Sequence, residues 1–383
     1  MIENLKILID FIINYFINLL VSPSKEIKQK SLLLIRLDAI GDYVLFRNYI
    51  EILKKSKKYR DYSLTLLGNS AWKSITKELD SEYIDNFIWL DRNKFNKGFV
   101  YRFIILKKLI SVGYEVVISP AFSREFFYAD TIVNLINAKE KIGSAGDLSN
   151  IKRWQKNISD KYYDRLIATD TNLMFEFDRN REFFENLLEQ KLDIKKPHMS
   201  LKPTTLAFDL PQNYAILFIG ASTCFRKWST EGFAKVGKYL QEKFGYKIVL
   251  CGAPSDSKEA KEFAKYFKSE YTDLVGKTSL IDLLHVINSG NLIVTNETSS
   301  PHFAIALEMA NIFVIYSGNH YGRFTPYPKE IAQNYHVILH PKIEKDLDNY
   351  KKLSNSYGYW SNLDISEIHS EIVIENINRV LNG

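Results

Sequence analysis

The chain has 383 residues, which is longer than one hydrophobic core usually supports, so two domains are expected. Its 46% hydrophobic and 25% charged residues are typical of globular proteins. The net charge of +6 suits anionic substrates or an anionic membrane but is too small to indicate nucleic-acid binding. Cys224 and Cys251 lack a metal-type spacing, so we expect a reducing compartment and no structural zinc.

Residues 1–30 form a separate segment. Residues 5–21 are mostly Leu, Ile, Phe and Tyr, which predicts an amphipathic helix with a narrow polar stripe. The stripe consists of Lys6, Asp10, Asn14 and Asn18. The run is too short and too charged to span a membrane, and it lacks a signal-peptide pattern. Two interpretations stay open: a helix in the membrane interface, which Lys25, Lys28 and Lys30 favour slightly, or a helix packed on the protein itself.

Strands and helices then alternate along the first half. The predicted strands are residues 32–37, 62–67, 87–90 and 115–119, and the predicted helices are 42–55, 101–111 and 179–191. Residues 144–178 are polar and break this rhythm. Lys and Pro residues between 195 and 203 are typical of a linker.

A second alternating series follows. Its predicted strands are residues 215–219, 247–250, 292–295 and 312–316, and its helices are 230–244, 256–267, 280–288, 301–308 and 365–381. Such alternation predicts an α/β fold with a mostly parallel sheet covered on both faces. We therefore expect two doubly wound domains, at 31–200 and 201–345, facing a cleft, with tail helices at 346–383.

The first candidate site follows the first strand. Gly41 permits a tight turn, and Asp42 is expected at the start of the next helix. Asp42 is a candidate general base for deprotonating an acceptor hydroxyl. The alternative is a helix-capping role, and Asp38 is a competing carboxylate on the same loop.

Two further candidate sites lie in the second half. After the strand at 215–219, Ser222, Thr223, Arg226 and Lys227 suit a phosphate group. After the strand at 292–295, hydroxyl side chains and a carboxylate precede a helix that Pro301 is suited to begin. These residues are Glu297, Thr298, Ser299, Ser300 and His302. The hydroxyls and free N–H groups suit a diphosphate, Glu297 suits a sugar hydroxyl, and His302 alone is more often structural.

Together these motifs resemble glycosyltransferase family 9, the ADP-heptose:lipopolysaccharide heptosyltransferases. The matching features are residues 35–42, Lys227-Trp228, residues 274–280 and residues 294–304. The resemblance implies a GT-B fold, ADP-heptose as donor, a lipopolysaccharide core acceptor and an inverting reaction without metal or cofactor. It also implies that Asp42 is the base and that Lys227, Thr298 and Ser299 face the diphosphate. Gly276, Lys277 and Thr278 would border the nucleotide.

The sequence departs from the family pattern at the third site. The family usually has Asp-Thr-Gly where this chain has Glu297, Thr298 and Ser299, which leaves the donor sugar and base open. On the acceptor side, the resemblance points to Gly41, Ser123 and Arg124.

Several alternatives stay open. The enzyme could use another nucleotide sugar or a protein acceptor, or it could be a nucleotide-sugar epimerase of the same fold. A degenerate binding protein is a non-catalytic alternative. A dinucleotide-dependent oxidoreductase is disfavoured because residues 38–42 are not a Gly-rich fingerprint. The expected location is cytoplasmic, with peripheral contact to the inner membrane left open.

Overall fold

The computed structural model describes residues 11–12, 16, 20, 23–354, 361 and 363–383. The helix expected at the N-terminus therefore lies mostly outside the described residues, although residues 11, 12, 16 and 20 are helical. Among the described residues, no helix combines the length and the hydrophobicity that crossing a bilayer requires.

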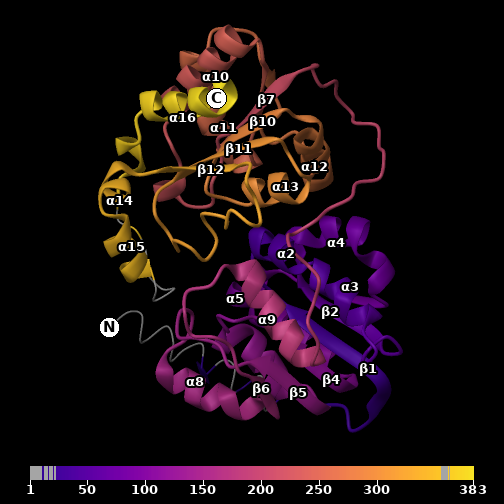
Figure 1. Cartoon of the computed structure of the whole chain (residues 1–383). Helices are drawn as coiled ribbons and strands as arrows, with labels where there is room; N and C mark the ends of the chain where they lie inside the picture. Colours follow the sequence, from indigo (N-terminus) through magenta and orange to yellow (C-terminus); the bar gives the residue numbers. More distant parts are fainter. Residues whose placement is uncertain (1–10, 13–15, 17–19, 21–22, 355–360, 362) are drawn as a thin grey trace. The chain divides into compact units, whose positions relative to one another are not determined.

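The chain divides into two compact units. Unit 1 consists of Met1–Asn172 and Phe177–Ile194, and unit 2 consists of Leu173–Glu176 and Lys195–Gly383. Each unit is built around a parallel β-sheet with helices packed on it (Figure 1). The predicted α/β class with parallel sheets is therefore confirmed.

The sheet of unit 1 has the strand order β3-β2-β1-β4-β5-β6. These strands are β1 (Ile27–Arg36), β2 (Ser63–Asn69), β3 (Asn86–Leu90), β4 (Gly113–Ser119), β5 (Ala138–Ser144) and β6 (Arg165–Ile167). Strand β1 lies centrally, pairing in parallel with β2 and β4, and its residues from Ser31 to Arg36 are all buried. It begins five residues before the predicted start, with Ile27 opposite Gly113.

The helices of unit 1 cover both faces of its sheet. They are α2 (Ile40–Phe46), α3 (Asn48–Lys55), α4 (Lys73–Leu79), α5 (Arg92–Lys97), α6 (Phe99–Ile110), α7 (Thr131–Leu135), α8 (Arg153–Ser159) and α9 (Glu176–Leu188). Helices α5, α6 and α7 share a hydrophobic core with alternate residues of β1, including Leu33 and Ile35. Tyr49 of α3 stacks on Phe184 of α9, with ring centroids 5.2 Å apart.

The sheet of unit 2 has the order β12-β11-β10-β7-β8-β9. These strands are β7 (Tyr214–Phe218), β8 (Lys247–Cys251), β9 (Thr272–Asp273), β10 (Leu292–Asn296), β11 (Asn311–Tyr316) and β12 (Tyr335–Leu339). The helices of this unit are α10 (Thr230–Phe244), α11 (Ser257–Tyr266), α12 (Leu280–Ser289), α13 (Ser300–Ala306), α14 (Pro341–Lys345), α15 (Leu347–Ser354) and α16 (Ser370–Asn382). Helices α10, α11 and α16 pack on one face of the sheet, and Figure 1 shows α12 and α13 away from them.

Both sheets have the same connectivity. In each unit the first strand lies between the second and the fourth, which is the doubly wound order 3-2-1-4-5-6. The order reverses between β1 and β4 in unit 1 and between β7 and β10 in unit 2. Ligands of such sheets bind outside the carboxyl ends of the strands at this reversal. The three candidate loops follow β1, β7 and β10, so each begins at a reversal point.

A buried polar cluster anchors helix α2, which carries Asp42. The Arg47 guanidinium, at the end of α2, contacts the Asp80 carboxylate, with Nη2 2.7 Å from Oδ1. Tyr43 donates a hydrogen bond to Asp80 and stacks on Trp72 with ring centroids 4.0 Å apart. Because Asp80 is only 2% exposed, this cluster holds α2 firmly against the end of α4.

We therefore predict that Asp80→Ala lowers the free energy of unfolding by about 3–5 kcal/mol, because it leaves the buried Arg47 charge uncompensated. Urea denaturation measures this loss. The double variant Arg47→Met, Asp80→Ala should recover part of it, because no buried charge then remains unpaired. A single variant as stable as the parent would show that the cluster does not anchor the helix.

Candidate functional site

The loop after β1 is held by side chains from neighbouring elements. The Asp38 carbonyl oxygen accepts hydrogen bonds from Trp72 Nε1 at 3.0 Å and Asn69 Nδ2 at 3.1 Å. The Asp38 carboxylate forms an ion pair with Arg36, with Nε 2.7 Å from Oδ2, and Arg36 is 1% exposed. The Asp38 carboxylate therefore has a structural partner in Arg36.

Asp42 lies in the first turn of α2, beside Gly41, and both residues are half-buried. The N-cap residue of this helix is Ala39, so Asp42 does not occupy the capping position. The two carboxylates of the loop therefore have different surroundings. Asp38 faces a buried arginine, and Asp42 lies in a helix turn at the reversal point of the sheet.

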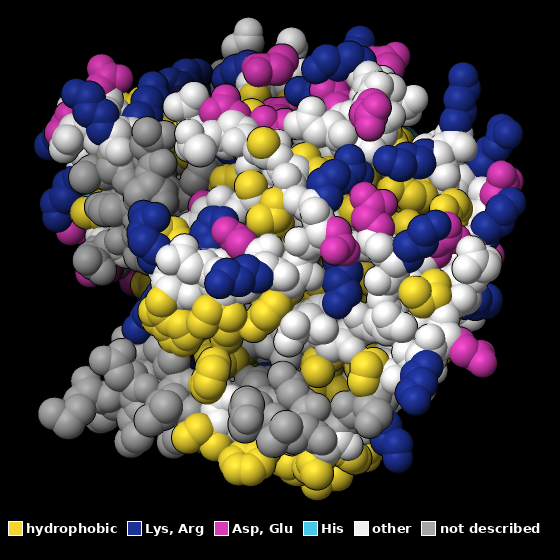
Figure 2. Space-filling view, turned by 90° about the horizontal axis from the view of Figure 1, so that it is seen from below, with side chains coloured by type: hydrophobic (Ala, Val, Ile, Leu, Met, Phe, Trp, Pro, Cys, Tyr) yellow, Lys and Arg dark blue, Asp and Glu magenta, His cyan; other side chains and the backbone are white. Residues whose placement is uncertain are grey.

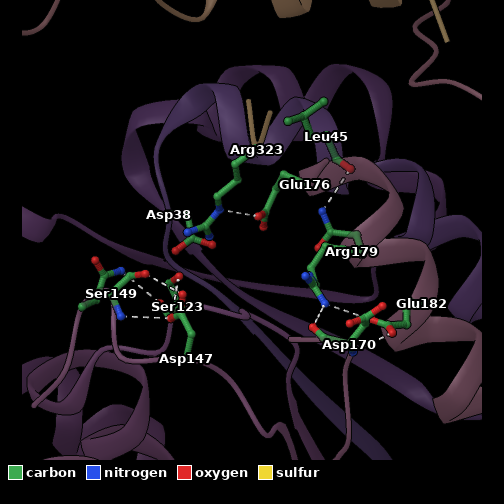
Figure 3. A network of polar contacts seen from close by, with 12 residues as sticks. Asp38, Leu45, Ser123, Asp147, Ser149, Asp170, Glu176, Arg179, Glu182 and Arg323 are labelled. Atoms are coloured by element: carbon green, nitrogen blue, oxygen red, sulfur yellow. Dashed lines mark hydrogen bonds and ion pairs between the residues drawn. The ribbon is translucent and has the colours of Figure 1, made fainter. Parts of the chain in front are cut away.

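The two candidate acceptor residues after β4 are both buried. Ser123 donates a hydrogen bond to Asp147 Oδ1 at 3.0 Å, within a loop network that includes Ser149 (Figure 3). The Arg124 side chain is 0% exposed and donates a hydrogen bond to Asp160. This contact positions the loop after β4, and the direct contact of Arg124 with an acceptor stays a prediction.

Lys227 lies at the end of the loop after β7, close to two carboxylates. Its Nζ is 2.8 Å from Asp256 Oδ1 and 2.7 Å from Glu259 Oε1. Burial alone would lower the pKa of Lys227, but these hydrogen bonds outweigh burial and raise the pKa. The ammonium group therefore stays charged and keeps a third N–H for another acceptor. On the same loop, Ser222 is exposed, and the buried Thr223 Oγ1 has no hydrogen-bond partner among the described residues.

Asp256 also shapes the turns around Lys227. A Cβ atom on Gly220 would lie 2.1 Å from Asp256 Oδ2, so only glycine lets the loop approach this carboxylate. Gly276 has a φ of +70° and donates its N–H to the Gly252 carbonyl at 3.0 Å. Lys277 beside it donates to the Asp273 carbonyl at 2.8 Å, and Thr278 is half-buried. The predicted nucleotide-bordering residues therefore lie next to the loop that follows β8.

Asn296 joins the loops after β7 and β10. Its Oδ1 accepts the Trp228 N–H at 3.0 Å, and its Nδ2 donates to the Ile219 carbonyl at 2.9 Å. Asn296 is 0% exposed, so both bonds are shielded from water. The amide thus brings the second and third candidate clusters to one place in unit 2.

Glu297, next in sequence, is a buried acid. It is 6% exposed, and its Oε2 has no hydrogen-bond partner among the described residues. Burial raises the pKa of Glu297 to about 7, against the opposing charge of Arg226. The buried Arg226 Nε also lacks a hydrogen-bond partner in the described part of the chain. An acid and a guanidinium with unused hydrogen-bonding capacity can both serve a polar ligand.

The remaining residues of the third cluster differ in exposure. Thr298 and Ser299 are half-buried at the start of α13. The Ser300 hydroxyl is instead fully buried, 2.7 Å from Thr295 Oγ1, and its contact with a diphosphate stays a prediction. His302 Nδ1 lies 2.7 Å from the Tyr327 hydroxyl. Burial, assisted by Arg226, lowers the pKa of His302 to about 4, so the ring is neutral at physiological pH.

A buried ion pair lies elsewhere in unit 2. Arg323 Nε donates to Glu176 Oε2 at 2.9 Å, and both residues are less than 7% exposed (Figure 3). Arg323 follows strand β11. The structure shows that its guanidinium fixes the segment Leu173–Glu176 to unit 2.

Sequence reasoning did not single out Asp256 or Asn296 as functional. Asp256 lies 29 residues from Lys227 along the chain, and Asn296 lies 68 residues from Trp228. No local pattern signals either contact. The one available signal is position, because Asn296 ends the strand that precedes the third cluster.

The raised pKa of Glu297 predicts a pH-dependent stability. The native state holds this proton more tightly than the unfolded chain, so the stability contributed by Glu297 should fall as the pH rises from about 4.5 to about 7. Glu297→Gln removes this dependence. The difference in melting temperature, variant minus parent, should therefore be about 5 °C larger at about pH 8 than at about pH 5. Melting curves of both proteins test this, with Glu242→Gln, at an exposed glutamate, as the control. A constant difference between parent and variant would contradict it.

Comparisons with known proteins identify the family and the fold. The family model for glycosyltransferase family 9 (heptosyltransferase) matches residues 102–353. The structure of a family 9 glycosyl transferase from Veillonella parvula DSM 2008 superposes with a TM-score of 0.68 at 18% identity, covering 94% of this chain and 99% of that one. E. coli heptosyltransferase WaaC with ADP-2-deoxy-2-fluoro heptose gives a TM-score of 0.63 at 18% identity, covering 91% and 99%.

E. coli ADP-heptose lps heptosyltransferase II gives a TM-score of 0.62 at 16% identity, covering 92% of this chain and 98% of that one. No curated protein sequence matches the chain. The structural likenesses show the fold, which is the GT-B type. Because the family model matches more than half of the sequence, the chain belongs to glycosyltransferase family 9 and is a glycosyltransferase.

Proposed function

We propose that this enzyme transfers a heptosyl group from ADP-heptose to a hydroxyl group of a lipopolysaccharide core or a related anionic glycan, with inversion and without a metal ion. The observation that carries the proposal is the joining of the β7 and β10 loops by Asn296, which brings the Lys227 loop and Glu297 together at the sheet reversal. The solved structures of E. coli WaaC with ADP and with a fluorinated ADP-heptose support ADP-heptose as the donor.

The proposed donor site uses the cationic groups of unit 2 for the diphosphate. Lys227 keeps a charge and a third N–H, and Arg226 has a guanidinium nitrogen without a hydrogen-bond partner among the described residues. Thr298 and Ser299 add hydroxyl groups, and Gly276 borders the nucleotide. Glu297 is the group proposed to meet a sugar hydroxyl, because a buried carboxyl with an unused oxygen forms a strong hydrogen bond.

The proposed reaction is a single displacement. The acceptor hydroxyl loses its proton to Asp42 as its oxygen bonds to the anomeric carbon, and the bond from that carbon to the diphosphate oxygen breaks. The charge that develops on the departing ADP is stabilised by Lys227 and Arg226. In this proposal Asp42 is the only group that exchanges a proton with the acceptor.

The place of the reaction follows from the acceptor. A lipid-linked core glycan is displayed at a membrane, so we propose that the enzyme works in the cytoplasm at the inner membrane. The apolar N-terminal segment is one candidate contact. Strand β1 begins at Ile27, so a truncation that tests this segment must end before that residue.

The role of Asp42 gives the most specific prediction. Asp42→Asn should lower kcat by about a hundredfold or more, because general base catalysis acts in the transition state. The donor Kd should stay near the parent value, because Asp42 belongs to unit 1 and is proposed to act on the acceptor. Steady-state kinetics and calorimetric titration of ADP-heptose without acceptor measure the two quantities.

Asp38→Asn is the matched control for this experiment. Its carboxylate contacts the buried Arg36, so the variant should lose stability while keeping most of its turnover once folded. If Asp38→Asn abolishes turnover and Asp42→Asn does not, the two carboxylates have the opposite roles. If both variants keep full turnover, the base lies elsewhere.

A further inference from the structure

The outer side of helix α6 is unusually apolar. The helix buries Leu106 and Leu109 in the core of unit 1, as expected for a helix packed on a sheet. Its solvent side also carries large hydrophobic residues, since Val100 is 69% exposed and Ile104 is 57% exposed. A surface helix normally presents polar residues to water. The exposed apolar side of α6 therefore indicates an interaction surface.

Helix α8 repeats this feature. Trp154 and Ile158 are four residues apart, so they lie on one side of the helix, and they are 42% and 36% exposed. The Trp154 ring makes an edge contact with Phe126, with centroids 5.8 Å apart. Phe126 begins the short helical turn η3 (Phe126–Asp130), which packs against α8.

The same turn connects α8 to α6. The buried Arg102 of α6 donates a hydrogen bond to the Phe127 carbonyl of η3 at 2.7 Å. The outer sides of α6 and α8, defined by Val100, Ile104, Trp154 and Ile158, are called here the α6–α8 face. Figure 2 views the molecule from below and shows groups of hydrophobic side chains on this side. Figure 1 places α8 at the bottom of the molecule, so α8 belongs to the same side.

Phe11, near the N-terminus, extends this surface. The Phe11 ring lies 6.5 Å from the Trp154 ring, centroid to centroid, in an edge contact. Phe11 is itself 40% exposed. The apolar surface is thus larger than either helix alone provides.

The two sequence stretches that form the α6–α8 face contain basic residues but no acidic ones. From Arg92 to Tyr114 the sequence has no Asp or Glu, and the same holds from Leu148 to Ser159. The exposed basic residues of these two stretches are Lys94, Lys97, Lys107, Lys108, Lys152 and Arg153. Exposed apolar side chains with flanking Lys and Arg are the features with which proteins bind the interface of an anionic bilayer.

We propose that the α6–α8 face docks on the surface of an anionic phospholipid bilayer. Trp154, Val100 and Ile104 enter the headgroup region, and Lys107, Lys108 and Lys152 contact lipid phosphates. A second copy of this chain is a poorer occupant, because it would bring two basic faces together and bury lysines, which protein interfaces avoid. The proposal goes beyond the transfer reaction, since binding to vesicles needs neither donor nor acceptor.

Co-sedimentation with sucrose-loaded vesicles tests the proposal. The full chain should partition at least about tenfold more strongly onto phosphatidylglycerol vesicles than onto phosphatidylcholine vesicles. The variant Val100→Ser, Ile104→Ser, Trp154→Ser should bind phosphatidylglycerol at least about tenfold more weakly. The variant Lys107→Gln, Lys108→Gln, Lys152→Gln should bind more weakly and respond less to salt.

Matched controls lie on α11 of unit 2. The variant Lys258→Gln, Lys261→Gln, Lys265→Gln removes the same charge, and Tyr266→Ser removes an exposed apolar side chain. Both controls should bind like the parent, and melting curves should show that every variant is folded. Parent-level binding by both face variants would overturn the proposal and assign vesicle binding to another surface. A parent that never sediments with vesicles would overturn it too, as would face variants that change only the oligomeric state in light scattering.

Discussion

The candidate donor site depends on the buried side-chain amide of Asn296. Strands β7 and β10 are paired neighbours, but the loops that follow them lead to different helices. The pairing of the strands therefore does not by itself fix the conformation of one loop relative to the other. Asn296 accepts from the Trp228 N–H and donates to the Ile219 carbonyl, and it does so without any exposure to water. These two bonds fix the Lys227 loop relative to Glu297. An aspartate at this position would accept the first bond but could not donate the second.

The candidate donor site in unit 2 contains a cation and an acid whose surroundings act on their charges in opposite ways. The charge of Lys227 is favoured, and the charge of Glu297 is disfavoured. Lys227 lies between Asp256 and Glu259, which secure its charge. Glu297 instead has a buried oxygen without a hydrogen-bond partner in the described part of the chain, and its pKa is raised to about 7. Such an arrangement costs stability in the free protein. Proteins retain buried groups of this kind mainly where a ligand uses their unsatisfied hydrogen-bonding capacity.

Much of the fold could be predicted from the sequence because its central strands are continuous apolar runs. Strands β1, β7 and β10 and most helices lie close to their predicted positions. Strand β5 escaped prediction because its first four residues, from Ala138 to Lys141, are polar or small and only partly buried. Strand β9 has two residues, too few for any periodic signal, and β12 follows a long irregular stretch after Tyr316.

The candidate site was predictable only in part, for a related reason. Loops that follow strands can be found from the pattern, so Asp42, Lys227 and Glu297 stand out. What a side chain contacts depends on residues far away in sequence. The contact of the Ser300 hydroxyl with Thr295 could not be read from the loop pattern, and neither could the burial of Arg124 against Asp160. Membership in glycosyltransferase family 9 rests on the family-model match over residues 102–353.

The central claim is acceptor-dependent transfer from ADP-heptose. The most direct test incubates the enzyme with ADP-heptose and EDTA, with and without a lipopolysaccharide core acceptor, and separates the products by chromatography and mass spectrometry. We expect stoichiometric ADP and glycosylated acceptor only when the acceptor is present, with turnover unaffected by the chelator. Conversion of the donor sugar without an acceptor, or no ADP formation under any condition, would contradict the claim.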